Sequence, residues 1–128
     1  MFKLPFDVDI NNLIDDLRFF SWEASDILRS YSEILKNKEK AKEIIKSKTL
    51  EDPVTLADLE VNDLIIRNIS ENYKKVNWDI LSEENVKIGS GNVEISSKWL
   101  WVIDPLDGTK DFIQGTGNYA MHLALNYE

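Results

Sequence analysis

A long stripe of apolar residues near the start of the chain limits what this sequence can fold into. The stripe has helical spacing and contains no Gly or Pro, and its members are Ile10, Leu13, Ile14, Leu17, Phe20, Ala24, Ile27, Leu28, Tyr31, Ile34 and Leu35. Asp9 can cap the start of this helix. We expect the lysine-rich stretch Lys36–Lys48 to continue the helix with a solvated face until Pro53 marks a boundary.

A second helix and three short strands are expected after this boundary. Thr55 and Asp58 stand at capping-box spacing ahead of another apolar stripe, which predicts a helix over Leu56–Glu71. Short runs of apolar, aromatic or β-branched residues predict strands at Trp78–Ser82 and Trp99–Ile103, and a last strand is expected at Tyr119–Tyr127. The fold class that follows is α+β, with two long helices followed by the strands of a mixed sheet.

Composition and charge exclude several classes of function. The 128 residues are 43% hydrophobic, which fits one globular domain or part of a larger one. The net charge of -8 argues against a nucleic-acid polymer as partner, and a polyanionic ligand would need a bridging cation. The absence of cysteine excludes disulfides and thiolate zinc sites. The apolar runs are too short for a transmembrane segment and the N-terminus lacks the pattern of a signal peptide, so we expect a cytoplasmic protein.

Two aspartates follow the apolar run Trp99–Ile103 and suggest a cation site. Pro105 restricts the backbone on either side of it, so the carboxylates of Asp104 and Asp107 can face one point, where oxygen ligands suit Mg²⁺. If Gly108 and Thr109 open a helix, their N–H groups favour an anion at the same point. An equally good interpretation of this stretch alone is a hairpin whose Asp-Gly turn joins two strands.

Two further segments are ambiguous when taken singly. Glu83 and Glu84 fit solvated loop residues, but they also end a strand that can lie parallel to Trp99–Ile103, and the acidic ends of the two strands would then meet. The Thr55–Asp58 spacing is explained by helix capping alone. The only histidine, His122, falls in a predicted strand and is expected to be a packed side chain rather than a ligand.

Taken together, the segments PVTLAD, ILSEE and DPLDGTKDF resemble, in order and spacing, the inositol monophosphatase superfamily of metal-dependent, lithium-sensitive phosphatases. The resemblance implies the layered α-β-α-β-α sugar-phosphatase-like fold. Residues 1–128 would be its N-terminal, metal-binding part, with the C-terminal half absent. The continuation at Lys110 and Asp111 is most similar to the 3'(2'),5'-bisphosphate nucleotidase branch of sulfur metabolism. It implies hydrolysis of the 3'-phosphate of adenosine 3',5'-bisphosphate to give AMP and phosphate. The alternatives are an inositol or sugar phosphate phosphatase, or a truncated, non-catalytic metal-binding remnant.

The resemblance also assigns roles to individual residues. It makes the Leu106 carbonyl and the carboxylates of Glu83, Asp104 and Asp107 ligands of Mg²⁺, with two or three ions in the complete site. It makes Thr109, with Asp58, the pair that orients and deprotonates a water held by the metal.

The remaining expectations concern substrate and assembly. The N–H groups of Gly108 and Thr109 would hold the substrate phosphate, and Lys110 and Lys48 would contribute to specificity for a small-molecule phosphate. A full-length member could be a homodimer. The resemblance further implies that the chain alone has negligible activity, because an aspartate from the second half of the domain would complete the metal site.

Overall fold

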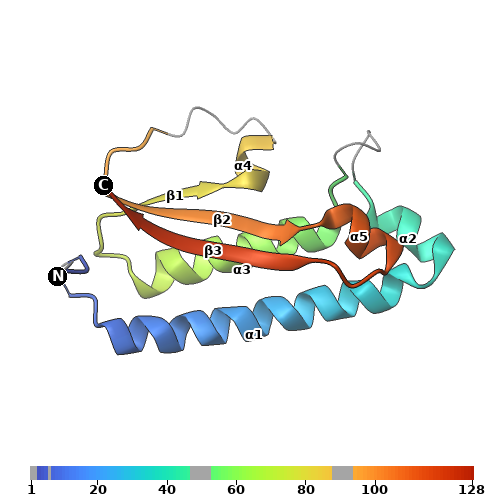
Figure 1. The fold of residues 1–128 in the computed structure, drawn as a ribbon, viewed down its shortest axis with the longest axis horizontal. Helices are drawn as coiled ribbons and strands as arrows, with labels where there is room; N and C mark the ends of the chain where they lie inside the picture. Colours follow the sequence, from blue (N-terminus) through green and yellow to red (C-terminus); the bar gives the residue numbers. More distant parts are fainter. Residues whose placement is uncertain (1–2, 6, 47–52, 88–93) are drawn as a thin grey trace.

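Two layers make up the structure, a computed structural model that describes residues 3–5, 7–46, 53–87 and 94–128. A layer of helices covers one face of a sheet in the described part of the chain (Figure 1). The elements in chain order are α1 (Ile10–Leu35), α2 (Lys38–Ile44), α3 (Leu56–Asn72), β1 (Asp79–Ser82), α4 (Glu83–Lys87), β2 (Trp99–Asp107), α5 (Thr109–Gln114) and β3 (Ala120–Tyr127).

Helix α1 starts where the sequence predicts but ends earlier than expected. The Asp9 carboxylate accepts hydrogen bonds from the N–H groups of Asn11 and Asn12, both at 3.0 Å, and so caps its first turn. The expectation that Lys36–Lys48 continues this helix is wrong. Asn37 takes an extended backbone and its side chain accepts from the N–H groups of Glu39 and Lys40, which starts the separate helix α2.

Helix α3 is capped as predicted and supplies much of the core. Thr55 and Asp58 form a reciprocal capping box at its first turn. The buried faces of α1 and α3 pack together and against the inner face of the sheet. The fully packed apolar side chains of this core include Phe20, Ala24, Val61, Ile65, Ile69, Trp101 and Ile103. Burial of this apolar surface stabilises the two layers against each other.

The sheet is mixed, as predicted, with strand order β1-β2-β3 among the described residues. Strand β1 pairs with β2 in parallel, with Ser82 opposite Ile103, so the carboxyl ends of both strands lie at the same edge. Strand β3 pairs with β2 antiparallel. Strand β2 runs to Asp107, four residues beyond the predicted end at Ile103. None of the described helices is both long and apolar enough to cross a membrane.

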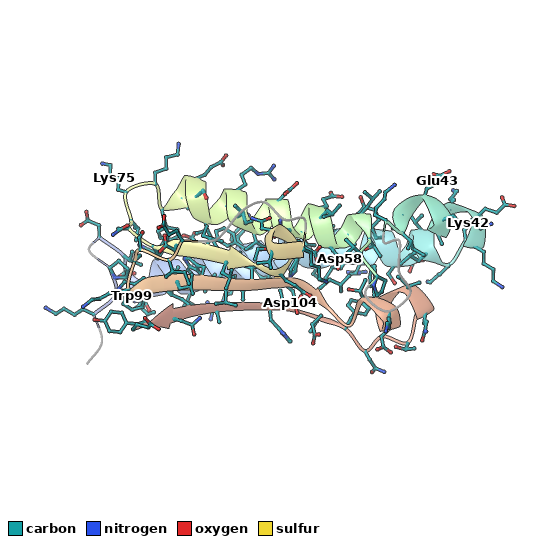
Figure 2. All side chains as sticks on the ribbon, turned by 90° about the horizontal axis from the view of Figure 1, so that it is seen from above. Lys42, Glu43, Asp58, Lys75, Trp99 and Asp104 are labelled. Atoms are coloured by element: carbon teal, nitrogen blue, oxygen red, sulfur yellow. The ribbon has the colours of Figure 1, made fainter. Side chains whose placement is uncertain are left out.

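Figure 2 shows how the site lies within this frame. Trp99, at the start of β2, and Lys75 lie toward one end of the molecule, whereas Lys42 and Glu43 of α2 lie at the opposite end. Asp58 and Asp104 lie between them, one from the helical layer and one from the sheet. The site is therefore built where the first turn of α3 meets the carboxyl end of β2.

Candidate metal and phosphate site

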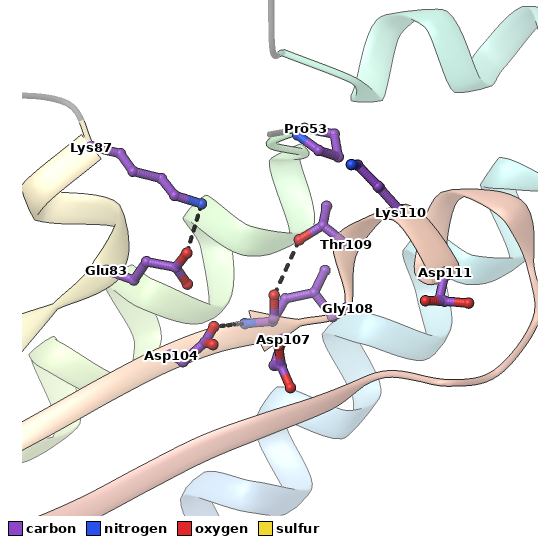
Figure 3. A pocket seen from close by; sticks show the side chains of 10 residues that line it. Pro53, Glu83, Lys87, Asp104, Asp107, Gly108, Thr109, Lys110 and Asp111 are labelled. Carbon is purple, nitrogen blue, oxygen red and sulfur yellow. Dashed lines mark hydrogen bonds and ion pairs between the residues drawn. The ribbon is translucent and has the colours of Figure 1, made fainter. Parts of the chain in front are cut away.

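A pocket of about 300 Å³ lies at the carboxyl ends of β1 and β2 (Figure 3). The residues that line it are Pro53, Glu83, Lys87, Asp104, Leu106, Asp107, Gly108, Thr109, Lys110 and Asp111. Most of the predicted site residues therefore meet at one place. Asp58 lies behind this lining and reaches it through Thr109, while Lys48 falls outside the described residues.

A bulge in β2 brings Asp104 and Asp107 to one pocket. Residues three positions apart on a regular strand point to opposite faces of the sheet. Between Asp104 and Asp107, however, β2 advances three residues while its partner β3 advances only from His122 to Ala120. The extra residue on β2 is a β-bulge, and it turns the second carboxylate toward the side of the first. The two residues between the aspartates, Pro105 and Leu106, are buried and hold this bend in place.

The carboxyl group of Asp104 lies in an electrostatically unfavourable place. Burial raises its pKa to about 6, and contact with Glu83 and repulsion from Asp107 act in the same direction. The N–H group of Leu106 donates to Asp104 Oδ1 at 3.2 Å and partly opposes this shift. Such a group is one whose negative charge a bound cation would stabilise.

Glu83 and Glu84 have different surroundings although they are adjacent. Glu83 lines the pocket, and its Oε1 pairs with Lys87 Nζ at 2.8 Å. Glu84 is 1% exposed, and burial followed by repulsion from Asp58 raises its pKa to about 7. Its Oε1 lies 3.7 Å from Lys87 Nζ, whereas no described residue forms a hydrogen bond with its Oε2. The interpretation of this pair as solvated loop residues is therefore wrong for Glu84.

Lys87 is a pocket residue that the sequence analysis missed. Its ammonium group holds Glu83 from one side of the pocket, while Lys110 lies across from it (Figure 3). The signal that could have found it is the Glu83–Lys87 spacing of four residues, which places opposite charges together on one face of a short helix.

Asp58 both caps a helix and contacts the pocket. Its Oδ2 accepts hydrogen bonds from the N–H group and the hydroxyl of Thr55, both at 2.7 Å. Its Oδ1 lies 3.0 Å from the hydroxyl of Thr109, which can donate to it. Burial raises the pKa of Asp58, and the hydrogen bonds from Thr55 and Thr109 oppose that rise. The capping interpretation and the pocket interpretation are therefore compatible.

The Thr109 hydroxyl has a second acceptor within reach. The carbonyl oxygen of Leu106 lies 3.1 Å from Thr109 Oγ1. A hydroxyl carries one proton, so it can donate to only one of the two acceptors at a time. Donation to Asp58 leaves the oxygen lone pairs of Thr109 free to accept a hydrogen bond from a molecule in the pocket.

Gly108 turns the chain from β2 into α5, as predicted for Gly108 and Thr109 opening a helix. Its φ of 85° lies in the left-handed region that favours glycine. A Cβ at this position would lie 2.5 Å from the backbone oxygen of Asn118. The alternative of a two-strand hairpin at this Asp-Gly pair is wrong, because helix α5 follows and β3 pairs only after it.

His122 is exposed, contrary to the expectation of a packed side chain. It lies on β3 directly opposite Asp104 of β2. Its side chain is 62% exposed, and its Nδ1 lies 3.9 Å from Asp107 Oδ2. The strand was predicted correctly, but the histidine occupies the outer face of the sheet rather than the face under the helices.

The donor set of the pocket fits a hard divalent cation. It consists of carboxylates and a main-chain carbonyl, which are the oxygen ligands that Mg²⁺ accepts, commonly through only one or two carboxylates. Burial first, and then the neighbouring carboxylates of Glu83 and Asp107, raise the pKa of Asp104, and a bound cation would offset these effects. Within the described part of the chain, no three acidic or imidazole side chains are gathered closely enough to form a finished metal cluster. The residues therefore fit a Mg²⁺ ion that keeps waters or phosphate oxygens among its ligands.

Part of this chain is similar in sequence to several known proteins. The chain is 34% identical over 83 residues to the 3'(2'),5'-bisphosphate nucleotidase CysQ of Escherichia coli K12. The matched stretch covers 63% of this chain and 31% of that relative. It is 35% identical over 85 residues to the Nus factor SuhB of Pseudomonas aeruginosa, covering 66% and 30%. It is 37% identical over 62 residues to inositol monophosphatase 1 of Xenopus laevis, covering 48% and 21%. The matched part thus spans less than a third of each of these relatives.

Solved structures share the fold. The structure of the suppressor protein SuhB from Bartonella henselae superposes with a TM-score of 0.66 at 21% identity, over 91% of this chain and 41% of that chain. Inositol monophosphatase II from Staphylococcus aureus superposes with a TM-score of 0.61 at 22% identity, over 91% and 37%. The sequence model described as the inositol monophosphatase family matches residues 16–128. The structure described above is thus a partial sugar-phosphatase fold, and the chain belongs to the inositol monophosphatase family.

Proposed function

We propose that residues 1–128 form the N-terminal, metal-binding part of a Mg²⁺-dependent phosphomonoesterase, and that the whole protein removes the 3'-phosphate of adenosine 3',5'-bisphosphate. The observation that carries this proposal is the hydroxyl of Thr109, which lines the acidic pocket and lies 3.0 Å from the buried Asp58. A hydroxyl linked to a buried carboxylate beside a cluster of oxygen ligands is an arrangement suited to hydrolysis by water.

The metal would be held by the carboxylates of Glu83, Asp104 and Asp107 and by the carbonyl oxygen of Leu106. When bound, Mg²⁺ neutralises phosphate charge and lowers the pKa of water. Glu83 is held in the pocket by Lys87, and Asp104 is oriented by the N–H group of Leu106. The ligands are therefore partly positioned by contacts within the chain.

Asp58 and Thr109 would orient the attacking water. When Thr109 donates its proton to Asp58, its oxygen can accept a proton from a water molecule, and the buried carboxylate can take up the proton that Thr109 passes on. The capping box fixes Asp58 at the first turn of α3, so this acceptor has little freedom to move. The N–H groups of Gly108 and Thr109 would hold the substrate phosphate at the start of α5.

The substrate proposal rests on the residues that follow Thr109 and on the relatives. Lys110 lines the pocket and can pair with a phosphate, and Asp111 follows it in the sequence that resembles the bisphosphate nucleotidases. Several of the matched relatives carry that name, including CysQ of Escherichia coli K12. Lys48 is proposed, with Lys110, to contribute to specificity for the substrate. The similarity to inositol monophosphatase 1 of Xenopus laevis favours an inositol or sugar phosphate as the second candidate.

The proposal is tested by phosphate release from adenosine 3',5'-bisphosphate and from inositol 1-phosphate, each with and without Mg²⁺. The assay uses this chain and a form extended to the length of its relatives, since residues from the rest of the family domain would complete the pocket. We expect the extended form to need Mg²⁺, to prefer the nucleotide and to be inhibited by Li⁺. Asp104→Asn should remove most of the Mg²⁺-dependent activity.

Asp63→Asn is the matched control, because it removes an exposed carboxylate of α3 that does not line the pocket. Near-normal turnover in Asp104→Asn would contradict the assignment of Asp104 as a ligand. Faster release from inositol 1-phosphate would instead replace the nucleotide by the second candidate. Turnover that is independent of Mg²⁺ would contradict the reaction type.

A further inference from the structure

Two neighbouring aromatic side chains of α1 are exposed. Trp22 is 64% exposed and Phe19 is 61% exposed, the largest fractions among the exposed large apolar side chains of the described residues. Their ring centroids lie 5.6 Å apart, so the two rings form one apolar surface rather than two separate ones. Aromatic side chains are enriched where proteins bind one another, and Trp is a frequent centre of the binding energy there.

This surface lies on a side of α1 that the rest of the described structure leaves uncovered. Helix α1 runs along one border of the molecule (Figure 1). Its inner side packs into the core through Phe20 and Ala24. Trp22 lies two residues from each of them, and positions two apart on a helix point to opposite sides. Another side of α1 contacts α3, where Glu23 accepts a hydrogen bond from the Asn68 amide at 3.2 Å.

The charged residues on the outer face of α1 are arranged symmetrically about Trp22 but with opposite signs. Exposed residues follow one another on this face at spacings of three or four, and they are Asp15, Arg18, Trp22, Asp26 and Arg29. Arg18 and Asp26 each lie four residues from Trp22, on either side of it. Asp15 and Arg29 each lie seven residues from it. At both distances, therefore, one residue is basic and the other is acidic.

We propose that this face binds the same face of a second copy of the chain, with the two α1 helices antiparallel and crossing at Trp22. Residues at equal distances on opposite sides of the crossing then meet, so Arg18 faces Asp26 of the second copy and Asp15 faces Arg29 of the second copy. Each contact occurs twice, because a two-fold axis relates the copies. A parallel pair would instead place each charge beside its own counterpart, which is repulsive.

The reversal of sign about Trp22 is what identifies a second copy as the partner. A face that binds a different protein must complement that protein, and its own charges need not reverse about one residue. A face that binds itself needs this reversal, because the same surface supplies both sides of the contact. Arg18 is able to change partners: its pair with Asp15 at 2.8 Å joins side chains that are 66% and 70% exposed, and such pairs contribute little to stability.

The test is sedimentation equilibrium of the form extended to the length of its relatives, because the rest of the family domain is then in place. We expect a concentration-dependent self-association. Trp22→Ala should raise its dissociation constant at least about tenfold, as for a Trp at the centre of an interface. Arg18→Glu and Asp26→Arg should each weaken association, because each places like charges opposite one another. The variant with both reversals should regain the affinity of the parent, since opposite charges then meet again.

Asp63→Arg is the matched control, because it reverses an exposed charge on α3 instead of α1, and it should associate like the parent. A parent that is monomeric at every concentration would overturn the proposal and leave this face to the rest of the domain or to another protein. Association that Trp22→Ala and Arg18→Glu leave unchanged would also overturn it, as would failure of the double reversal to regain affinity.

This inference goes beyond the proposed function, because none of the five residues lines the acidic pocket. Phosphate release and the urea midpoint should therefore be the same in these variants as in the parent. Absence of phosphate release by the parent would count against the proposed function alone, whereas the sedimentation measurements decide the proposed contact between copies.

Discussion

Replacing Gly108 by alanine should be among the most destabilising small changes in this chain. The φ of 85° places the residue in the left-handed region, where an L side chain costs about 1–2 kcal/mol. The added Cβ would also lie 2.5 Å from the Asn118 backbone oxygen and 3.3 Å from Tyr119 Cα. Relief of this overlap must move backbone, and overpacking of this kind costs about 1–3 kcal/mol. Together the two effects predict a loss of about 2–5 kcal/mol.

Gly117 provides a matched control for this substitution. Its φ is 84°, but no atom lies within 4 Å of the position that its Cβ would take. Gly117→Ala therefore includes the conformational cost without the steric one and should lose only about 1–2 kcal/mol. The difference between the two losses of stability therefore measures the cost of the steric overlap between a Cβ at residue 108 and the backbone of Asn118 and Tyr119.

Urea unfolding followed by circular dichroism measures both losses. With a slope of about 2 kcal/mol per molar, Gly108→Ala should lower the midpoint by about 1–2.5 M and Gly117→Ala by about 0.5–1 M. Equal midpoints for the two variants would refute the reasoning, because the contact with Asn118 would then carry no energy. Loss of the folded baseline in Gly108→Ala but not in Gly117→Ala would support it.

Two further predictions concern the buried carboxylates. The pKa of Glu84 is raised from 4.5 to about 7, so the folded state binds its proton more tightly than the unfolded state does, and the free energy of unfolding should fall as the pH rises from about 4.5 to 7. Glu84→Gln should remove that pH dependence and should be more stable than the parent at pH 8 by at most about 3 kcal/mol. Urea unfolding from about pH 4.5 to pH 8 measures both effects. An unchanged pH dependence of the free energy of unfolding in Glu84→Gln would contradict this reasoning. Thr109→Ala should lower kcat of the extended enzyme about 10²-fold or more with little change in metal affinity, because it removes the hydroxyl that donates to Asp58. Thr109→Ser keeps a hydroxyl at this position and should restore most of the rate. Equal losses in Mg²⁺ binding would make Thr109 a ligand instead.

Local sequence signals predicted the starts of the two long helices and the places of the three strands, but not the short helix α4. The capping box of Thr55 and Asp58 located the start of α3, and short apolar runs with aromatic or β-branched residues located β1 and β2, because both signals act within a few residues. The error over Lys36–Lys48 came from following the lysine-rich composition past Asn37. That residue is a strong N-cap, and its side chain starts a new helix.

Side-chain surroundings were harder to predict because they depend on contacts between distant segments. Nothing near Glu84 in the sequence distinguishes it from Glu83, yet only Glu84 is buried, where α4 packs against β1 and β2. The wrong environment assigned to His122 has a different cause. The alternation of Met121, Leu123 and Leu125 with smaller or polar residues already indicates which face of β3 packs against the core, and His122 lies on the other face.

The pairing of Asp104 with Asp107 shows how a site can depend on an irregularity that spacing alone does not reveal. Three residues along a regular strand would separate these carboxylates on opposite faces of the sheet. Buried Pro105 has no N–H group to donate to the sheet ladder and Leu106 turns its carbonyl toward Thr109, so the extra residue is accommodated as a bulge where ladder bonding is already interrupted. The same carbonyl is the proposed metal ligand. The residues that interrupt the strand are therefore the ones that bring both carboxylates, one carbonyl and the Thr109 hydroxyl to the same pocket.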